Sequence, residues 1–448
     1  MTTENAARSA AADGERHVHD PGRVTTLAAE VRRGSTTATA LVERYLERIE
    51  AVEPAVCAWR VVDAERALAE AGVLDAETRA GHLRGPLHGV PVAVKDIIDV
   101  EGLPTRCNSP ALQGRPPASV DAAVVTALRA AGAVILGKAH TTEFAFFDPS
   151  PARNPHHTGH TPGGSSSGSA AAVAAGMVPG SLGTQTVASV NRPAAYCGIA
   201  AYKPSSGLLP THGVTPLAPV YDTVGFFGWN VSDATALFEA VCPAHAAAAP
   251  APPGDRALHV VRLEDPLLDE ATPTVTARVV EAASRMRAAG HTVETRRSCV
   301  AFESIRADQY TCAMHETGRV HRALLDLEPG RLGAKLREAI EHGLTIDHAT
   351  YRAARARIDA ARHELFVALA DADAVLWPAA PDTAPPGLAW TGDPRFISPW
   401  TALGGPIVTV PVGVGDDALP IGALLCGAPG RDRAFASIAR RLAAALGR

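Results

Sequence analysis

Two hydrophobic patterns occupy the early part of the chain, and the first of them is helical. Between residues 25 and 50, apolar side chains recur at i, i+4 spacing, at Leu27, Val31, Leu41, Tyr45 and Ile49. Hydroxyl residues at 35–37 interrupt the pattern, and such residues commonly cap the N-terminus of a helix. The pattern therefore predicts a helical hairpin at the front of the chain.

The second pattern is that of strands connected by a helix. Valines alternate with other residues between positions 90 and 94, which is the period of a β-strand, and this run ends at Lys95. An Ala-rich helical segment follows at 122–131, and a short apolar run follows at 133–136. Strand, helix and strand in succession favour a parallel α/β unit.

Glycine and serine dominate residues 162–169, and the Ala-rich segment 170–175 comes directly after them. A tight loop that leads into a helix N-terminus is the expected structure. The low-complexity Ala/Pro stretch 244–253 indicates a surface connection.

The remaining patterns give the domain organisation. Helical periodicity dominates residues 269–371, strands and turns return at 372–425, and an amphipathic helix is predicted at 435–446. We expect a disordered N-terminal segment at 1–22 and a single α/β domain at 23–448. Within that domain the segment 258–370 is expected to be mostly helical.

Composition narrows the class of ligand. The chain has 448 residues and 46% hydrophobic content, so it is long enough to bury a large core. Its net charge is −5, with 42 basic and 47 acidic residues, which argues against nucleic acid and anionic membranes as partners. The seven cysteines are scattered, and neither a leader nor a membrane span is apparent, so we expect a cytoplasmic protein with a small-molecule substrate.

Three local motifs carry the candidate chemistry, and they occur in a fixed order. A valine-rich run ends at Lys95, the Gly-Gly-Ser-Ser loop begins its serines at Ser165, and Ser189 follows 24 residues later. Together they resemble the motifs of the amidase signature family. The resemblance extends over nearly the whole chain except the segment 258–370, which varies among relatives and usually shapes the acyl pocket.

The resemblance implies a fold, a reaction and three catalytic roles. The fold is a mixed β-sheet core surrounded by α-helices. The reaction is hydrolysis of a carboxamide through a seryl acyl-enzyme, without a cofactor. In the family mechanism Ser189 is the nucleophile, Ser165 follows a cis peptide bond and relays protons, and Lys95 is the base.

Elementary chemistry agrees with this assignment. A serine hydroxyl is a weak nucleophile and must lose its proton as it attacks a carbonyl carbon. Lysine, with an ordinary pKa of about 10.4, serves as a base near neutral pH only if burial or nearby positive charge lowers that pKa. We therefore expect Lys95 to be buried at the end of its strand. Asp96 and Arg192 are expected to support the surrounding loops by ion pairing.

The turn before Ser189 is expected to supply the oxyanion hole through the backbone N–H groups of Thr186, Val187 and Ala188. This turn departs from the family pattern. Relatives usually have Gly-Gly at 187–188 and Asp two positions earlier, where this chain has Gln185. If the turn requires a positive φ, a Cβ at these positions costs about 1 kcal/mol, which would alter the oxyanion geometry.

Substrate contacts are predicted at Phe144, Phe146 and Gln185. Lys138 also follows a strand, but Lys95 is preferred as the base because its motif is the one that matches. A phosphate-binding role for the Gly/Ser loop is disfavoured, since no lysine follows Gly168 as a Walker motif requires.

Three further possibilities bear on ligands and partners. The histidines at 156, 157 and 160 lack accompanying carboxylate or cysteine ligands, so no metal is predicted. A biosynthetic acyltransferase with the same triad is the second function considered, and a non-catalytic binding relative is the third. The expected partner is a small-molecule amide, and a homodimer remains open.

Overall fold

The computed structural model describes residues 15–242, 254–328 and 330–447. Within these residues, eleven strands form one mixed sheet in the order β1-β3-β2-β4-β6-β5-β10-β11-β9-β7-β8. The strands are β1 (Trp59–Val62), β2 (Pro91–Lys95), β3 (Val134–Ala139), β4 (Gly180–Gln185), β5 (Ala200–Lys203), β6 (Thr223–Gly228), β7 (His259–Glu264), β8 (Thr292–Arg297), β9 (Ala374–Pro378), β10 (Ile407–Val414) and β11 (Pro420–Cys426). Strand β2 pairs in parallel with both β3 and β4, whereas β4 and β6 are antiparallel. The predicted α/β fold with a mixed sheet is confirmed.

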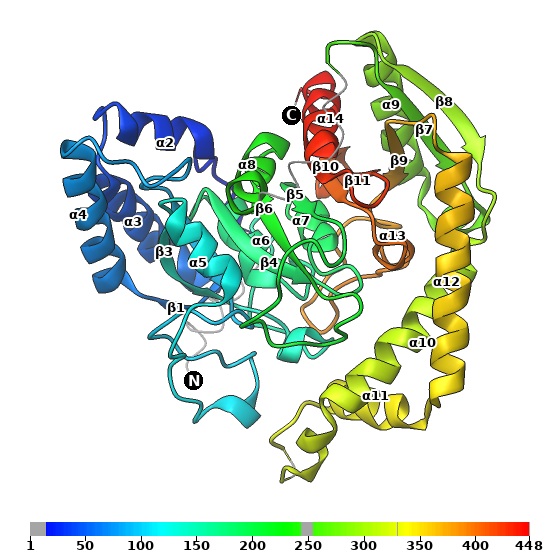
Figure 1. The fold of residues 1–448 in the computed structure, drawn as a ribbon, viewed down its shortest axis with the longest axis horizontal. Coiled ribbons are helices and arrows are strands. Elements are labelled where there is room, and N and C mark those ends of the chain that lie inside the picture. The colour runs from blue at the N-terminus through cyan, green and yellow to red at the C-terminus, as the bar shows by residue number, and fades with distance from the viewer. Residues whose placement is uncertain (1–14, 243–253, 329, 448) are drawn as a thin grey trace, which may run out of the picture.

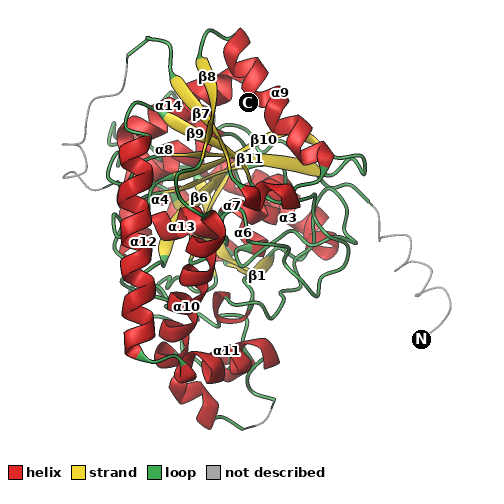
Figure 2. Ribbon diagram, turned by 90° about the vertical axis from the view of Figure 1, so that its right-hand side faces the viewer, coloured by secondary structure: helices red, strands yellow, loops and turns green. Residues whose placement is uncertain are grey.

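Helices surround this sheet (Figure 1). The helices are α2 (Val24–Arg32), α3 (Ala38–Val56), α4 (Ala64–Arg79), α5 (Ala123–Ala130), α6 (Ser167–Ala174), α7 (Asn191–Tyr196), α8 (Val231–Val241), α9 (Pro273–Ala288), α10 (Phe302–Val320), α11 (Ala334–Thr345), α12 (His348–Ala368), α13 (Ser398–Leu403) and α14 (Asp432–Ala445). Figure 2 shows α10 and α12 running side by side, away from the strands.

Most of the predicted elements are present. Helices α2 and α3 are the predicted hairpin, and β2, α5 and β3 are the predicted strand, helix and strand. The final helix also forms, as α14. The prediction of helix throughout 269–371 is wrong at β8, where only Val293 is buried. This strand lies at the sheet edge, so its charged side chains face solvent and its sequence lacks the apolar signature of a strand.

The N-terminal prediction needs a correction for residues 15–22, which are held against the body. The N–H of His17 donates to the carbonyl of Pro155 at 2.7 Å, and the N–H of His19 donates to the carbonyl of Ala174 at 3.1 Å. Backbone pairing therefore anchors a segment whose polar sequence predicted disorder. The rest of that prediction, at 1–14, and the predicted connection at 244–253 lie outside the described residues.

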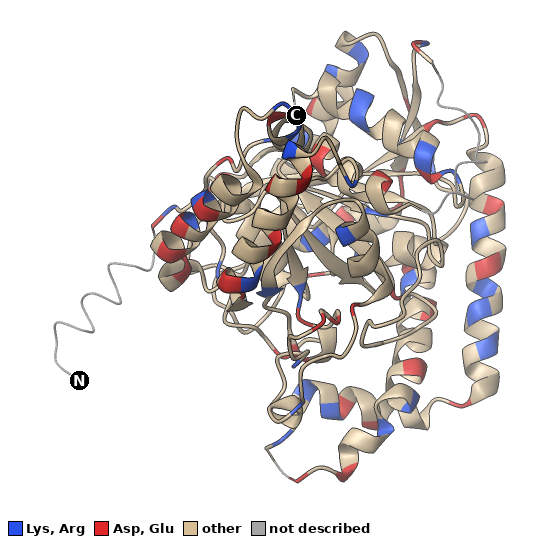
Figure 3. Ribbon diagram, turned by 60° about the vertical axis from the view of Figure 1, so that its left-hand side comes forward, with Lys and Arg blue, Asp and Glu red and all other residues tan. Residues whose placement is uncertain are grey.

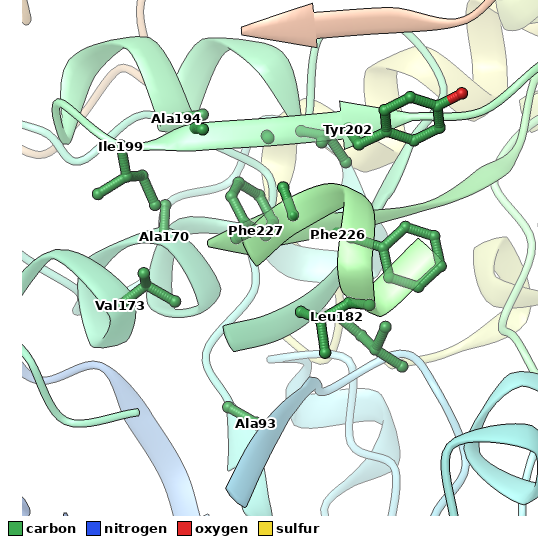
Figure 4. Packing of buried hydrophobic residues seen from close by; sticks show 14 of the residues in the cluster. Ala93, Ala170, Val173, Leu182, Ala194, Ile199, Tyr202, Phe226 and Phe227 are labelled. Atoms are coloured by element: carbon green, nitrogen blue, oxygen red, sulfur yellow. The ribbon is translucent and has the colours of Figure 1, made fainter. Parts of the chain in front are cut away.

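The centre of the core packs around β4, β5 and β6 (Figure 4). Ala170 and Val173 of α6 lie on one side of these strands, and Tyr202 and Phe226 point to the other side. There the ring of Tyr202 stacks on Phe238 of α8 with centroids 4.5 Å apart. Apolar surface is thus buried on both faces of the central strands, which is the main contribution to their stability.

Serine hydroxyls join α6 to β4 within this core. Ser169 donates to the carbonyl of Leu182 at 2.8 Å, and Ser181 donates to the carbonyl of Ser169 at 2.8 Å. Because both residues are fully buried, these bonds form in a low-dielectric environment and hold the two elements in one register. The loop before α6 and the turn after β4 are thereby fixed relative to each other.

Charge is distributed without a dominant sign. Acidic and basic side chains are interspersed over the described residues (Figure 3). Within these residues, no helix combines the length and apolarity that crossing a bilayer requires.

We predict that Gly168→Ala lowers the free energy of unfolding by about 3 kcal/mol. A Cβ at this position in α6 would lie 2.1 Å from the carbonyl oxygen of Ala58 and 2.5 Å from the amide nitrogen of His140, so backbone must shift. Chemical denaturation measures the change. Gly72→Ala in α4 is the matched control, because its Cβ meets open space, and this variant should gain about 0.5–1 kcal/mol. Equal stability of the two variants would contradict the packing argument.

Candidate active site

Lys95 ends β2 with its side chain completely buried. Its Nζ donates to the Oγ of Ser165 at 2.7 Å and to the Oγ1 of Thr184 at 2.9 Å. Burial lowers the pKa of Lys95 to about 7, although the negative charge of Asp222 acts in the opposite direction. A large fraction of this amine is therefore uncharged near neutral pH, as a base requires.

Ser165 lies in the Gly/Ser loop that precedes α6, and the peptide bond between Gly164 and Ser165 is cis. Only 2% of Ser165 is exposed. Its carbonyl accepts a hydrogen bond from the N–H of Thr142 at 3.1 Å, and Arg192 donates from Nη2 to the carbonyl of Gly164 at 2.8 Å. The loop is thus held on both sides of the cis bond, with the Ser165 hydroxyl directed at Lys95.

Ser189 lies in the turn between β4 and α7, with 7% of the residue exposed. The N–H of Ser166 donates to its carbonyl at 3.3 Å, so this turn contacts the loop that contains Ser165. The tertiary structure therefore brings all three predicted catalytic residues to one region, since Lys95 bonds to Ser165 and the Ser165 loop bonds to the Ser189 turn.

The turn before Ser189 is held through its carbonyl oxygens. Three side-chain or backbone donors bind them: Gln309 Nε2 to Thr186 at 3.1 Å, Thr401 Oγ1 to Val187 at 2.6 Å, and the N–H of Arg192 to Ala188 at 3.0 Å. Among the described residues, none accepts a hydrogen bond from the N–H groups of Thr186, Val187 or Ala188. Their role as donors to a substrate oxygen stays a prediction.

Val187 and Ala188 adopt conformations that suit residues with a Cβ. Neither is among the non-glycine residues with positive φ in the described part of the chain. The steric cost that a positive φ would impose is not incurred here. The turn therefore accommodates both residues in place of glycines without a strained backbone.

Gln185 supports this turn from within, which corrects its predicted role in substrate binding. Its Oε1 accepts from the N–H groups of Val190 and Asn191 at 2.8 and 3.0 Å. Its Nε2 donates to Asn191 Oδ1 and Thr401 Oγ1, both at 2.9 Å. All four hydrogen-bonding positions of the amide are used, and the residue is completely buried, so no group remains for a substrate.

A cavity of about 210 Å³ opens beside Ser189, and we call it the inner chamber. Ser189, Thr186 and Val187 form one wall, and Phe146 lies on another. The remaining lining is mostly apolar and comes from α10 and from residues near α13, namely Gln309, Tyr310, Ala313, Met314, Thr317, Pro394 and Ser398, together with Ala145, Phe147, Arg192, Leu217 and Arg306. No Asp or Glu is among the described residues that line it.

The two predicted phenylalanine contacts have different outcomes. Phe146 lines the inner chamber, and its contact with a substrate stays a prediction. Phe144 is 5% exposed and packs edge-on against His321 with ring centroids 5.1 Å apart, so it is a core residue outside the lining. Phe144 and the next residue, Ala145, both have a positive φ, which sequence periodicity does not reveal.

The Nζ atom of Lys138 has different neighbours from the Nζ atom of Lys95. Its Nζ lies 3.0 Å from the Asp96 carboxylate and donates to Thr105 Oγ1 at 2.9 Å. The Lys138 amine is thus paired with a carboxylate and a threonine, and neither Ser165 nor Ser189 is among its hydrogen-bond partners. The ion pair predicted for Asp96 is present, whereas Arg192 binds backbone carbonyls instead of a carboxylate.

The three histidines at 156, 157 and 160 bind backbone groups. His156 Nε2 lies 3.1 Å from the carbonyl of Cys197, and His160 Nδ1 lies 2.8 Å from the carbonyl of Ala384. The N–H of Gly159 donates to His157 Nδ1 at 3.1 Å. The three imidazole rings therefore stabilise their loop through hydrogen bonds to backbone groups.

Sequence reasoning missed several residues that support the site. Thr184 is the second partner of Lys95, and Gln309 and Thr401 bind the oxyanion turn. Thr184 lies in β4, shortly before Ser189, and the other two come from distant helices. None of them has a local pattern that marks it, so only the folded chain identifies them.

Comparison with known proteins places this chain in a family. The family model described as Amidase matches residues 40–435. The chain belongs to the amidase signature family. A glutamyl-tRNA(Gln) amidotransferase subunit of Symbiobacterium thermophilum is 36% identical, with 91% of this chain and 93% of that protein aligned.

Solved structures of this family superpose over nearly the whole chain. A crystal structure of an amidase has a TM-score of 0.85 and 30% identity, covering 94% of this chain and 99% of the other. The native peptide amidase from Stenotrophomonas maltophilia has a TM-score of 0.78 and 29% identity, covering 94% and 96%. The fold of these amidases is thus retained here.

We predict that kcat/KM for an amide substrate rises with pH, by about tenfold per unit below pH 7, and levels off above pH 7. The reason is that Lys95, with a pKa of about 7, accepts a proton only when it is neutral. Steady-state rates between about pH 5 and about pH 9 measure the profile. Lys95→Met should lower kcat/KM by about 10³-fold and remove this pH dependence. A rate that increases as the pH falls below 7 would exclude Lys95 as the base.

Proposed function

We propose that this protein is an amidohydrolase that cleaves a carboxamide C–N bond through an acyl ester on Ser189. The observation that carries the proposal is the 2.7 Å hydrogen bond between the fully buried Lys95 amine and Ser165, in a loop that contacts the Ser189 turn. A lysine with a pKa near 7 and a hydroxyl partner has the chemistry of a general base rather than of a structural cation.

In the proposed reaction the proton moves along three groups. Neutral Lys95 takes the proton of Ser165, and Ser165 takes the proton of Ser189 as the Ser189 Oγ bonds to the substrate carbonyl carbon. The carbonyl oxygen gains negative charge and accepts hydrogen bonds from the amides of the 186–188 turn. The C–N bond then breaks as the relay returns a proton to the leaving nitrogen.

Water completes the cycle by the same route. It loses a proton to the relay as it attacks the acyl ester, and the proton returns to Ser189 as the carboxylic acid leaves. Each step conserves protons, and the products are a carboxylic acid and ammonia or an amine.

The composition of the inner chamber supports hydrolysis of an apolar amide. Most of its lining is apolar, and its charged groups in the described residues are both arginines, Arg192 and Arg306. An α-amino acid amide carries an ammonium group, which requires an acidic partner once it is removed from water. No such partner lines the chamber in the described part of the chain, so an acyl group without a cationic substituent is favoured.

Transfer of the acyl group or of ammonia to another molecule is the second candidate function. The relative with 36% identity is an amidotransferase subunit by name, and the observation that favours this alternative is its alignment over almost the entire chain. Other subunits would accompany such a role. A purely binding role is disfavoured, because a binder has no need of a neutral buried lysine beside two serines.

We predict that an activated fluorophosphonate forms a covalent adduct on Ser189 of the folded protein. Mass spectrometry of the labelled peptide locates the adduct. Ser189→Ala should abolish labelling, and Ser165→Ala should slow it by about 10²–10³-fold, because the attacking hydroxyl loses its proton acceptor. Absence of any adduct would favour a binding role.

Product partition separates hydrolysis from transfer. With a primary amide as substrate, added hydroxylamine competes with water for the acyl ester. A hydrolase should still release mainly carboxylic acid at low hydroxylamine concentrations. If the acyl group were transferred only to an amine, and no carboxylic acid formed without the amine, the amidohydrolase proposal would be rejected. That result would support the transfer function.

A further inference from the structure

A second cavity lies directly outside the inner chamber. Its volume is about 500 Å³, and we call it the vestibule. Phe146, Phe147 and Tyr310 line both spaces, so the two cavities share a wall of aromatic rings and are adjacent. One layer of aromatic side chains therefore lies between the chamber beside Ser189 and the vestibule.

The vestibule presents aromatic rings to solvent. Tyr310 and Trp390 are each 50% exposed, and both line it together with Ala339 and His342. Tyr310 stacks on His342 with centroids 6.0 Å apart. Exposing large aromatic side chains together at the mouth of a cavity leaves apolar surface unburied, which is typical of a binding surface.

Lys335 holds the walls of the vestibule together. Its Nζ donates to the carbonyl of Ala389 at 2.8 Å and to the carbonyl of Phe147 at 3.3 Å. These bonds connect α11 both to the loop that carries Trp390 and to the segment that carries Phe146 and Phe147. The rings are thus positioned by the fold before any ligand arrives, which reduces the entropy cost of binding.

The position of the proton relay decides which part of a substrate points toward the vestibule. The leaving nitrogen must receive its proton from the relay, so it must face Ser165 and Lys95. The chamber is lined by Ser189 and the oxyanion turn, whereas neither Ser165 nor Lys95 lines it. The chamber consequently lies on the acyl side of the scissile bond.

We propose that the vestibule binds the far end of an extended, uncharged acyl group, with an aryl or alkyl terminus packed against Trp390 and Tyr310. The substrates would then be amides of long arylaliphatic or aliphatic carboxylic acids. This inference rests on the proposed function for the direction of the substrate. An anionic terminus is disfavoured, because Glu338 lines the vestibule and the Lys335 amine is already bound to two carbonyls.

The test compares a short and a long substrate. In the native protein, kcat/KM for 6-phenylhexanamide should exceed that for acetamide. Trp390→Ala should reduce the ratio of these two values by about tenfold, since the terminal ring loses an aromatic partner and buried area. Val367→Ala, an exposed apolar residue on α12, is the control and should retain the native ratio. An unchanged ratio in Trp390→Ala would overturn the proposal.

A third substrate tests the direction. N-(6-phenylhexyl)acetamide carries the same terminal ring on the amine side of the bond. Trp390→Ala should leave the ratio of kcat/KM for this amide to that for acetamide within about twofold of the native value. Trp390→Ala could instead lower this ratio and leave the ratio of 6-phenylhexanamide to acetamide unchanged. The vestibule would then bind the leaving group, and the proposal would be wrong.

Binding without turnover separates this proposal from the proposed function. Calorimetry with 6-phenylhexanamide compares Ser189→Ala with the double variant Ser189→Ala/Trp390→Ala. The proposal expects about tenfold weaker binding to the double variant. Equal binding would overturn it even if amides are hydrolysed. Weaker binding to the double variant, combined with no hydrolysis by the native protein, would overturn the proposed amidohydrolase function and support the proposed role of the vestibule in binding.

Discussion

The removal of one lysine amine from water is the constraint on which the rest of this site depends. Lys95 ends a strand that is buried along its whole length, and its amine has two hydroxyl partners instead of a carboxylate. Lys138, on the neighbouring parallel strand, is equally buried but lies 3.0 Å from Asp96. Burial lowers the pKa of Lys95 to about 7, against the opposing charge of Asp222. The two lysines therefore differ in the groups that contact their amines, which are hydroxyls for Lys95 and a carboxylate with a hydroxyl for Lys138.

The turn that carries Ser189 depends on a different kind of interaction, namely hydrogen bonds to its backbone carbonyl groups. Its carbonyls are bound by side chains and backbone from several elements, whereas the N–H groups of residues 186–188 have no acceptor among the described residues. Gln185 stabilises the turn because its side-chain amide forms four hydrogen bonds, to Val190, Asn191 and Thr401. Val187 and Ala188 fit this turn without strain, because neither has a positive φ.

Distant parts of the chain build the space that receives a substrate. The inner chamber combines the turn after β4 with α10 and the residues near α13, and the vestibule adds α11 and the loop of Trp390. Lys335 connects these parts through backbone carbonyls. The turn after β4 and the helices α10 and α11 thus meet at these two cavities, and α10 also holds that turn through Gln309.

The sequence by itself determined the family, the mixed α/β fold, and the three residues of the predicted relay. These features are local, because hydrophobic periods and short motifs are readable from neighbouring residues. Only the tertiary structure decided that Gln185 supports the turn, that Phe144 is a core residue, and that Thr184, Gln309 and Thr401 hold the site. The contacts of Phe144, Thr184, Gln309 and Thr401 join residues far apart in the chain, whereas three of the four Gln185 bonds are to residues five or six positions away. A single sequence has no pattern for either kind of contact, since a buried glutamine and a substrate-binding glutamine differ only in what surrounds them.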